Sequence, residues 1–186
     1  MIRLFVGLPL PEDVRRYLLS LHMGVRFARW QRDDQLHLTL KFVGEVPEST
    51  ARDLDENLAQ IRMTPFTLSL EGAGIFGDMR RPRVLWAGVT PQGEVTRLRD
   101  KVEMAALRAG IPLEQRKYVP HVTLARFSGE RQAESGLAAF LEARGDLRTP
   151  PFLVREFALF SSHLSSSGSI YRVEARYPLD GEDWSD

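Results

Sequence analysis

Apolar residues recur along the chain with two periods, which predict alternating strands and helices. Apolar or alternating runs predict strands at 2–8, around LHLTLKFV, at 66–76, at 83–89 and around HVTLARF. Two more strands are expected in PFLVREFALFSSHL and SIYRVEARYPL, on either side of a Ser/Gly turn. Stripes with helical spacing predict helices from Pro11 to near Gly24, and at 48–62, 92–109 and 131–143.

The order of these elements indicates an α+β fold. Helices come singly, while pairs of strands follow each other directly, which requires antiparallel pairing. The second half repeats the order of element types found in the first half. We therefore expect one domain over residues 1–186, built of two intertwined lobes. Each lobe would have an antiparallel sheet with helices on its outer face, and a pseudo-twofold would relate the lobes across a central cleft.

One short sequence motif, His-x-Thr-Leu, occurs twice, in QLHLTLKF (35–42) and PHVTLARF (120–127). We call each copy a histidine word. Side chains alternate between the faces of a strand, so His37 and Thr39 share one face, and His121 and Thr123 share another. Strict alternation also places Lys41 with His37, where it would contact the substrate or only border the cleft, and places Phe42 in the core. If a pseudo-twofold relates the lobes, two imidazoles and two hydroxyls meet around one ligand.

Two histidines near their ordinary pKa of about 6.5 suit concerted acid–base chemistry. One removes a proton from the attacking group and the other donates a proton to the leaving group, each role typically contributing about a hundred- to ten-thousand-fold. Threonine hydroxyls donate to oxygens that gain negative charge. Hydrolysis of a phosphodiester without a metal or cofactor fits this set.

Other interpretations of the two words are weaker. A single His-x-Thr in a strand is usually half-exposed sheet surface. Metal binding would lack a carboxylate or thiolate at ligand spacing, and the chain has no cysteine. Serine–histidine catalysis lacks a G-x-S-x-G turn. His22 near a helix end and His163 before a polar turn are expected to be structural.

Composition adds that the chain is an ordinary globular protein of 186 residues with zero net charge. A strongly basic surface of the kind that duplex binders carry is therefore excluded. A polyanion would have to meet local positive groups, for which the candidates are Arg80, Arg81, Arg83, Arg116, Lys117 and Arg126. No apolar run is long enough for a membrane span or a signal sequence, so a cytoplasmic monomer without a membrane partner is expected.

At these residues the chain resembles the 2H phosphoesterase superfamily, which is named for two H-x-[ST]-x words. More narrowly, it resembles the bacterial RNA 2′,3′-cyclic phosphodiesterases, also described as 2′-5′ RNA ligases. The likeness covers nearly the whole chain, through RLFVGLPLP, LHLTLKFVGEVPE, GAGIFGDMRRPRVLWAGV, RKYVPHVTLARF and FALFSSHLSSSGSIYRVEARYPL.

The resemblance implies a bilobal fold and a phosphoric diester hydrolase acting on RNA that ends in a 2′,3′-cyclic phosphate, tRNA halves among them. The product would be a 2′-phosphate. By this likeness His37 donates a proton to the leaving 3′ oxygen, and His121 activates water. Thr39 and Thr123 would hold the phosphate oxygens. The reverse reaction would join RNA ends through a 2′-5′ link.

Substrate contacts beyond the two words are less determined by the sequence. Arg126 occupies a position that the family fills with arginine, yet it needs a bulge to reach the phosphate; otherwise it forms a salt bridge behind the sheet. Base stacking could come from Tyr118, Phe5, Phe76 or Phe42, although strict alternation makes Phe42 a core residue. A nucleotide- or RNA-binding module that uses the cleft without turnover is the alternative function, and a physiological ligase shares the same site.

Overall fold

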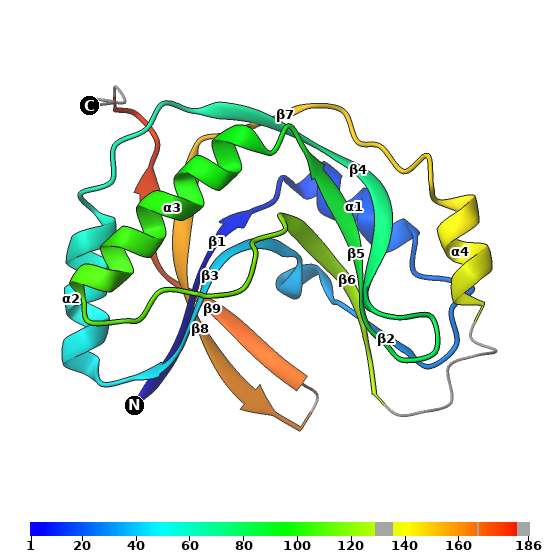
Figure 1. Cartoon of the computed structure of the whole chain (residues 1–186), viewed down its shortest axis with the longest axis horizontal. Helices are drawn as coiled ribbons and strands as arrows, with labels where there is room; N and C mark the ends of the chain where they lie inside the picture. Colours follow the sequence, from blue (N-terminus) through cyan, green and yellow to red (C-terminus); the bar gives the residue numbers. More distant parts are fainter. Residues whose placement is uncertain (129–135, 167, 182–186) are drawn as a thin grey trace.

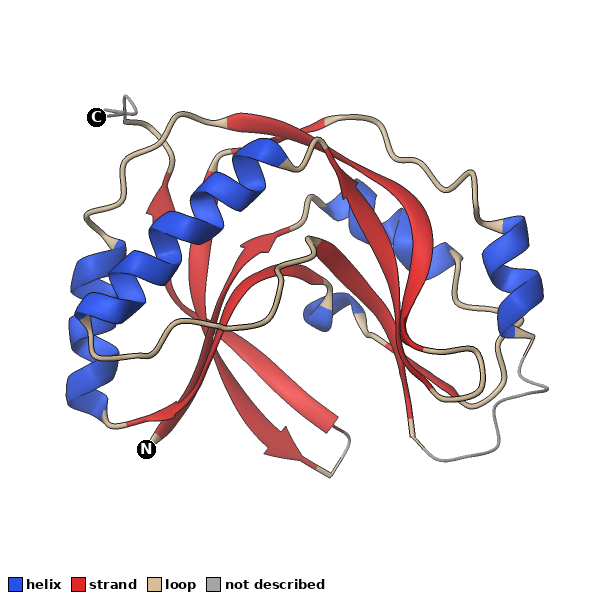
Figure 2. Cartoon of the chain, viewed as in Figure 1, coloured by secondary structure: helices blue, strands red, loops and turns tan. Residues whose placement is uncertain are grey.

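The computed structural model describes residues 1–128, 136–166 and 168–181 and forms one antiparallel, strongly curled sheet with helices around it (Figures 1 and 2). The strand order is β7-β4-β5-β6-β3-β1-β8-β9, and the short β2 pairs with β6. The strands are β1 (Ile2–Pro9), β2 (Ala28–Trp30), β3 (His37–Val46), β4 (Phe66–Gly77), β5 (Pro82–Thr90), β6 (His121–Phe127), β7 (Phe152–Val154), β8 (Glu156–Ser165) and β9 (Gly168–Pro178).

The sheet has two similar halves that meet at its centre. Strands β3 and β6 are the central pair, and their register joins Leu38 to Val122. Outward from that pair, β1 and β8 on one side match β5 and β4 on the other. The predicted α+β fold with antiparallel strands is confirmed, and the two lobe sheets are joined through β3 and β6 into one.

Four α-helices and a short 3-10 helix connect the strands: α1 (Glu12–Ser20), η1 (Asp33–Gln35), α2 (Glu48–Leu58), α3 (Gly93–Arg108) and α4 (Leu137–Ala143). Helices α2 and α3 contact each other over the half that contains β1 and β3, whereas α1 and α4 lie on the opposite side (Figure 1). Helix α3 follows β5 yet contacts β3 of the other half. None of the helices in the described parts of the chain is long and apolar enough to span a membrane.

Each helix buries the stripe that its sequence predicts. In α1, Val14 and Leu18 are buried and two carboxylates occupy the first turn, near the positive end of the helix dipole. In α3 the buried side includes Val95, Leu98 and Val102. These side chains join the inward residues of the central strands in one continuous core, which holds β3 and β6 rigidly from behind.

A β-bulge occurs at the same place in both histidine words. On β3, Thr39 lies opposite Gly7 and Lys41 opposite Val6, so Leu40 is the extra residue. On β6, Thr123 lies opposite Trp86 and Ala125 opposite Leu85, so Leu124 is the extra residue. Because one inserted residue exchanges the two faces, the side chains beyond each bulge are reversed relative to strict alternation.

The bulges make two predictions wrong, those for Lys41 and Phe42. They also supply the bulge that Arg126 was expected to need. Lys41 lies on the core face and is 4% exposed, so its predicted place beside His37 is wrong. Phe42 is 59% exposed and lies opposite Phe5, so its predicted place in the core is also wrong. Arg126 comes to the face of His121, through the bulge that the sequence analysis required.

Other differences concern element bounds. The segment PFLVREFALFSSHL was expected to form one strand, but it forms β7 and β8, which pair with β4 and β1 in opposite halves of the sheet. Strand β2 and helix η1 were not predicted. Helices α1 and α2 end earlier than expected, and α4 begins at Leu137, while positions 131–135 of its predicted range lie outside the described residues.

Candidate active site

The two histidine words lie side by side at the centre of the sheet, because β3 and β6 are neighbours there. His37 and Thr39 come from β3, and His121 and Thr123 come from β6. The apolar residues between and behind them, Leu38 and Leu124 among them, are fully buried in the core. The structure thus brings together the four polar residues that the sequence analysis singled out.

The ring of His37 is fixed by hydrogen bonds at both nitrogens. Nδ1 lies 2.7 Å from the backbone carbonyl oxygen of Gln35, and Nε2 lies 3.0 Å from Oγ1 of Thr39. A carbonyl oxygen can only accept, so Nδ1 carries a proton and Nε2 is the nitrogen that gains or loses one. Aromatic rings enclose the imidazole: Phe5 at 4.6 Å and Tyr171 at 5.4 Å between ring centroids.

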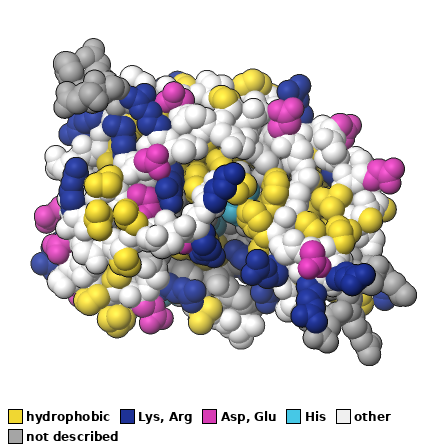
Figure 3. Space-filling view, in the orientation of Figure 1, with side chains coloured by type: hydrophobic (Ala, Val, Ile, Leu, Met, Phe, Trp, Pro, Cys, Tyr) yellow, Lys and Arg dark blue, Asp and Glu magenta, His cyan; other side chains and the backbone are white. Residues whose placement is uncertain are grey.

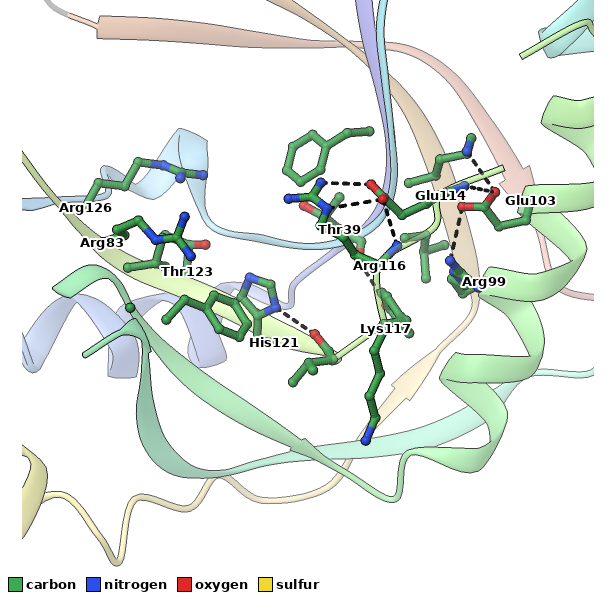
Figure 4. Close-up of a pocket in the computed structure, with 18 of the residues that line it drawn as sticks. Thr39, Arg83, Arg99, Glu103, Glu114, Arg116, Lys117, His121, Thr123 and Arg126 are labelled. Carbon is green, nitrogen blue, oxygen red and sulfur yellow. Dashed lines mark hydrogen bonds and ion pairs between the residues drawn. The ribbon is translucent and has the colours of Figure 1, made fainter. Parts of the chain in front are cut away.

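His121 is held in the same way from the other half. Its Nδ1 lies 2.8 Å from the carbonyl oxygen of Val119, also two residues earlier in the chain (Figure 4). Nε2 is therefore again the exchangeable nitrogen. Phe76 meets the imidazole edge-on at 4.8 Å, and Trp86 lies at 6.3 Å. The two imidazoles have the same tautomer, and each is held by a hydrogen bond from Nδ1 to the backbone carbonyl two residues earlier. This arrangement suits two opposite proton-transfer roles.

Burial and a nearby cation favour the neutral form of both imidazoles. Burial lowers the pKa of His37 to about 4, with smaller contributions in the same direction from the charges of Arg126 and His121. Burial also lowers the pKa of His121, and Arg126 again adds to this effect. The hydrogen bonds to the Gln35 and Val119 carbonyls oppose these shifts. Arg126 is thus close enough to act electrostatically on both histidines.

A cavity of about 680 Å³ opens in front of the central strands. Thr39, Thr123, His121 and Arg126 line it, and His37 adjoins it through the hydrogen bond to Thr39. Lys and Arg side chains surround the hollow in which a histidine surface is visible (Figure 3). The residues that line the cavity include five arginines and two lysines: Arg29, Arg83, Arg99, Arg116, Arg126, Lys41 and Lys117. The cavity therefore favours an anionic ligand, although the whole chain is neutral.

Two of the predicted substrate contacts have other partners in the structure. The ammonium of Lys41 is buried, 2.8 Å from Oε2 of Glu103 and 3.0 Å from the carbonyl oxygen of Pro112, so the structure gives no support to a substrate contact. The hydroxyl of Tyr118 donates to the carbonyl oxygen of Thr39 at 2.9 Å, and the guanidinium of Arg99 lies over its ring. Burial raises the pKa of Tyr118, which keeps this hydroxyl protonated.

Several residues of the site were not identified from the sequence. Tyr171 reaches His37 from the β8–β9 hairpin, far away in the chain. Arg29 reaches the cavity from β2, a strand too short to carry a periodic signal. Phe42 was a stacking candidate that strict alternation placed in the core, and the structure shows its exposed ring lining the cavity. No local pattern marks Tyr171 or Arg29, because long-range pairing brings them to the site.

The remaining histidines lie elsewhere. The ring of His22 stacks on Trp30 at 4.7 Å, and Nε2 of His163 lies 3.2 Å from Oγ of Ser161. Within the described residues, no group of three or more histidine, aspartate or glutamate side chains is arranged to hold a metal ion.

Comparison with known proteins agrees with this geometry. The family model described as LigT like Phosphoesterase matches residues 8–86 and 88–171, and each match contains one histidine word. The chain belongs to the LigT-like phosphoesterase family. The resemblance to the 2H phosphoesterases is thereby confirmed.

Relatives and solved structures of this family cover nearly the whole chain. An RNA 2′,3′-cyclic phosphodiesterase of Aeropyrum pernix is 39% identical, covering 82% of this chain and 86% of the relative. Another RNA 2′,3′-cyclic phosphodiesterase, of Aquifex aeolicus, is 32% identical, covering 97% of this chain and 98% of the relative. The structure of E. coli LigT complexed with 3′-AMP superposes with a TM-score of 0.75 at 28% identity, covering 96% of this chain and 98% of that one. The structure of a Thermus thermophilus protein superposes with a TM-score of 0.79 at 28% identity, covering 98% of this chain and 100% of that one.

Proposed function

We propose that the protein is an RNA 2′,3′-cyclic phosphodiesterase that opens a terminal 2′,3′-cyclic phosphate to a 2′-phosphate. The observation that carries the proposal is the pair of imidazoles with equivalent mounts, each with Nε2 exchangeable, beside a cavity rich in arginine. The names of the relatives in the same family support this substrate class.

The proposed reaction gives the two histidines opposite proton-transfer roles. Nε2 of His121 takes a proton from water as the water oxygen forms a bond to phosphorus. The bond between phosphorus and O3′ breaks, and O3′ takes the proton carried by Nε2 of His37. The products are a 2′-phosphomonoester and a 3′-hydroxyl. Thr39, Thr123 and Arg126 hold the non-bridging oxygens as their negative charge grows. No step requires a metal or a nucleotide cofactor.

The proton donor must gain its proton as the substrate arrives, because burial lowers the pKa of His37 to about 4. A bound phosphodiester carries a negative charge that offsets Arg126 and favours the imidazolium form. Binding and protonation are therefore coupled: the anion raises the pKa of His37 and the imidazolium strengthens anion binding. The site is charged for catalysis only when a phosphate occupies it.

The same groups acting in reverse would join a 2′,3′-cyclic end to a 5′-hydroxyl through a 2′-5′ link. We include this ligation in the proposal as the microscopic reverse of hydrolysis, with tRNA halves among the candidate substrates. High water concentration favours the hydrolytic direction.

The proposal is tested by incubating the protein with a short RNA that ends in a 2′,3′-cyclic phosphate, in excess EDTA, and separating the 2′- and 3′-phosphate products. Clean 2′-phosphate supports both the reaction and the placing of the acid beside O3′. Cleavage that requires a divalent ion contradicts the two-histidine mechanism. Binding of the RNA without cleavage in either condition favours a binding module.

A further inference from the structure

The two histidine words lie on neighbouring strands that share only a short ladder of backbone pairing. In the part of the chain that the structure describes, β3 and β6 are in register at one residue pair, Leu38 with Val122, whereas β1 is in register with β3 from Ile2 to Pro9. Pro120 directly precedes β6 and has no backbone N–H, so it cannot donate to the ladder. The relative position of the two words therefore also depends on contacts outside the ladder.

Tyr118 supplies such a contact from the segment before β6. Its hydroxyl donates to the backbone carbonyl oxygen of Thr39 at 2.9 Å. Thr39 belongs to the first word, and its own hydroxyl lies 3.0 Å from Nε2 of His37. Tyr118 also directly precedes Val119, whose carbonyl oxygen holds Nδ1 of His121. One phenol thus connects the strand that carries the first imidazole to the residues that hold the second.

Helix α3 holds this phenol in place. The guanidinium of Arg99 lies over the ring of Tyr118, with Cζ 5.2 Å from the ring centroid. Two carboxylates of the same helix anchor that guanidinium, Asp100 at 3.1 Å and Glu103 at 3.4 Å. A ring fixed in this way gives its hydroxyl a defined position, so its hydrogen bond to Thr39 can hold the two words at a fixed separation.

We propose that Tyr118 is a positioning residue that sets the separation of His37 and His121 through its hydrogen bond to Thr39. The inference rests on the proposed function, in which both imidazoles transfer protons at one phosphate. A displacement of about 1 Å between groups that act together can lower a rate by about a hundredfold. Binding depends less on this separation, because the phosphate contacts from β6 do not pass through the hydrogen bond.

The first test is Tyr118→Phe, which keeps the aromatic ring under Arg99 and removes only the hydrogen bond to Thr39. The substrate is a short RNA that ends in a 2′,3′-cyclic phosphate. We expect kcat to fall by about tenfold to a hundredfold, while KM stays within about twofold of the wild-type value.

Tyr177→Phe is the matched control. Tyr177 is buried, its hydroxyl donates to a carboxylate oxygen of Asp55, and neither residue lines the cavity. Each variant removes one hydrogen bond of a phenol, so each should lower Tm by about 2–4 °C. Only Tyr118→Phe should lower kcat, because only its hydrogen bond joins the two histidine words.

A second variant, Arg99→Lys, acts on the ring instead of the hydroxyl and decides the question if Tyr118→Phe does not fold. It keeps a positive charge beside Glu103 and removes the planar guanidinium that lies over the ring. We expect kcat to fall by about threefold to tenfold with little change in KM, since the phenol is then held less firmly.

An unchanged kcat in folded Tyr118→Phe would overturn the inference, and so would equal losses of kcat in Tyr118→Phe and Tyr177→Phe. A raised KM with unchanged kcat would also overturn it, because the hydroxyl would then be a substrate contact. In each of these cases hydrolysis by the wild-type protein leaves the proposed function standing. If the wild-type protein does not hydrolyse the RNA, the proposed function fails and this inference fails with it.

Discussion

The ammonium of Lys41 lies 2.8 Å from a carboxylate oxygen of Glu103, in a buried pair directly behind the first histidine word. The same carboxylate accepts from the backbone N–H of Glu114, and Arg99 approaches its other oxygen at 3.4 Å. The pair thus connects β3 to α3 and to the segment that leads into β6. It links the strand of His37 and the approach to the strand of His121 to one helix.

Removing the carboxylate should destabilise the fold, because it leaves the Lys41 ammonium buried without a counter-charge. We expect Glu103→Gln to lower the free energy of unfolding by about 3 kcal/mol. The matched control is Glu12→Gln, since Glu12 pairs with Arg16 on the exposed face of α1 and should contribute less than about 0.5 kcal/mol. Urea unfolding measures both free energies. A similar decrease in the two variants would show that the buried pair contributes no more to stability than the exposed pair.

The two histidines should be separately required for turnover. We expect His37→Ala and His121→Ala each to lower kcat by about a hundred- to ten-thousand-fold, since each removes one proton transfer. In the proposed mechanism the two groups act in one concerted step, so the double variant should lose less than the product of the two single effects. His163→Ala, which removes an imidazole that does not line the cavity, serves as the control. Near wild-type kcat in either folded single variant would refute the assigned roles.

The charge of Arg126 adds to the effect of burial in lowering the pKa of His37 and His121. Arg126→Gln removes a cation that lowers the pKa of His37 and of His121, so both pKa values should rise. NMR titration of the imidazole signals measures the change, with His22 and His163 as internal references. If neither catalytic histidine titrates at higher pH in the variant, Arg126 lies too far from the site for its proposed contact with phosphate.

Stability should fall in mild acid because His37 is held neutral in the folded protein. Its pKa is about 4 when folded, against an ordinary value near 6.5 in the unfolded chain. Above pH 6.5 the group is neutral in both states and the full stability is present. As pH falls from 6.5 to 4, only the unfolded state takes up the proton, which costs the folded state at most about 3 kcal/mol.

A His37→Gln variant isolates this effect. Urea midpoints at pH 7 and pH 5 should differ less for the variant than for the wild type, whereas His163→Gln should retain the wild-type difference. If the urea midpoint falls equally between pH 7 and pH 5 in the wild type and in His37→Gln, the acid effect belongs to other groups.

The sequence predicts the four polar residues of the site because they lie in a repeated, strictly alternating word. Alternation fails three residues after each histidine, at Leu40 and Leu124, where bulges reverse the faces. A bulge depends on the register of neighbouring strands, so the word itself carries no sign of it. For the same reason the split of PFLVREFALFSSHL at Arg155 was missed: the two strands differ only in their partners, which lie in opposite halves of the sheet.

Gly7 gives the last prediction, since it lies on β1 directly opposite Thr39 of the first histidine word. A Cβ at this position would meet the carbonyl oxygen of Leu38 at 2.9 Å and Cδ2 of His37 at 3.4 Å. The carbonyl belongs to the backbone and can yield only by moving the strand that carries the imidazole.

We therefore expect Gly7→Ala to lower kcat by about tenfold to a hundredfold through a small displacement of His37. The effect on KM should be smaller, because Thr123 and Arg126 belong to the other half of the sheet. Gly93→Ala, at the start of α3 where a Cβ meets nothing within 4 Å, is the matched control. Steady-state kinetics with a cyclic-phosphate RNA separates kcat from KM, and an unchanged kcat in Gly7→Ala would mean that β1 does not position the acid.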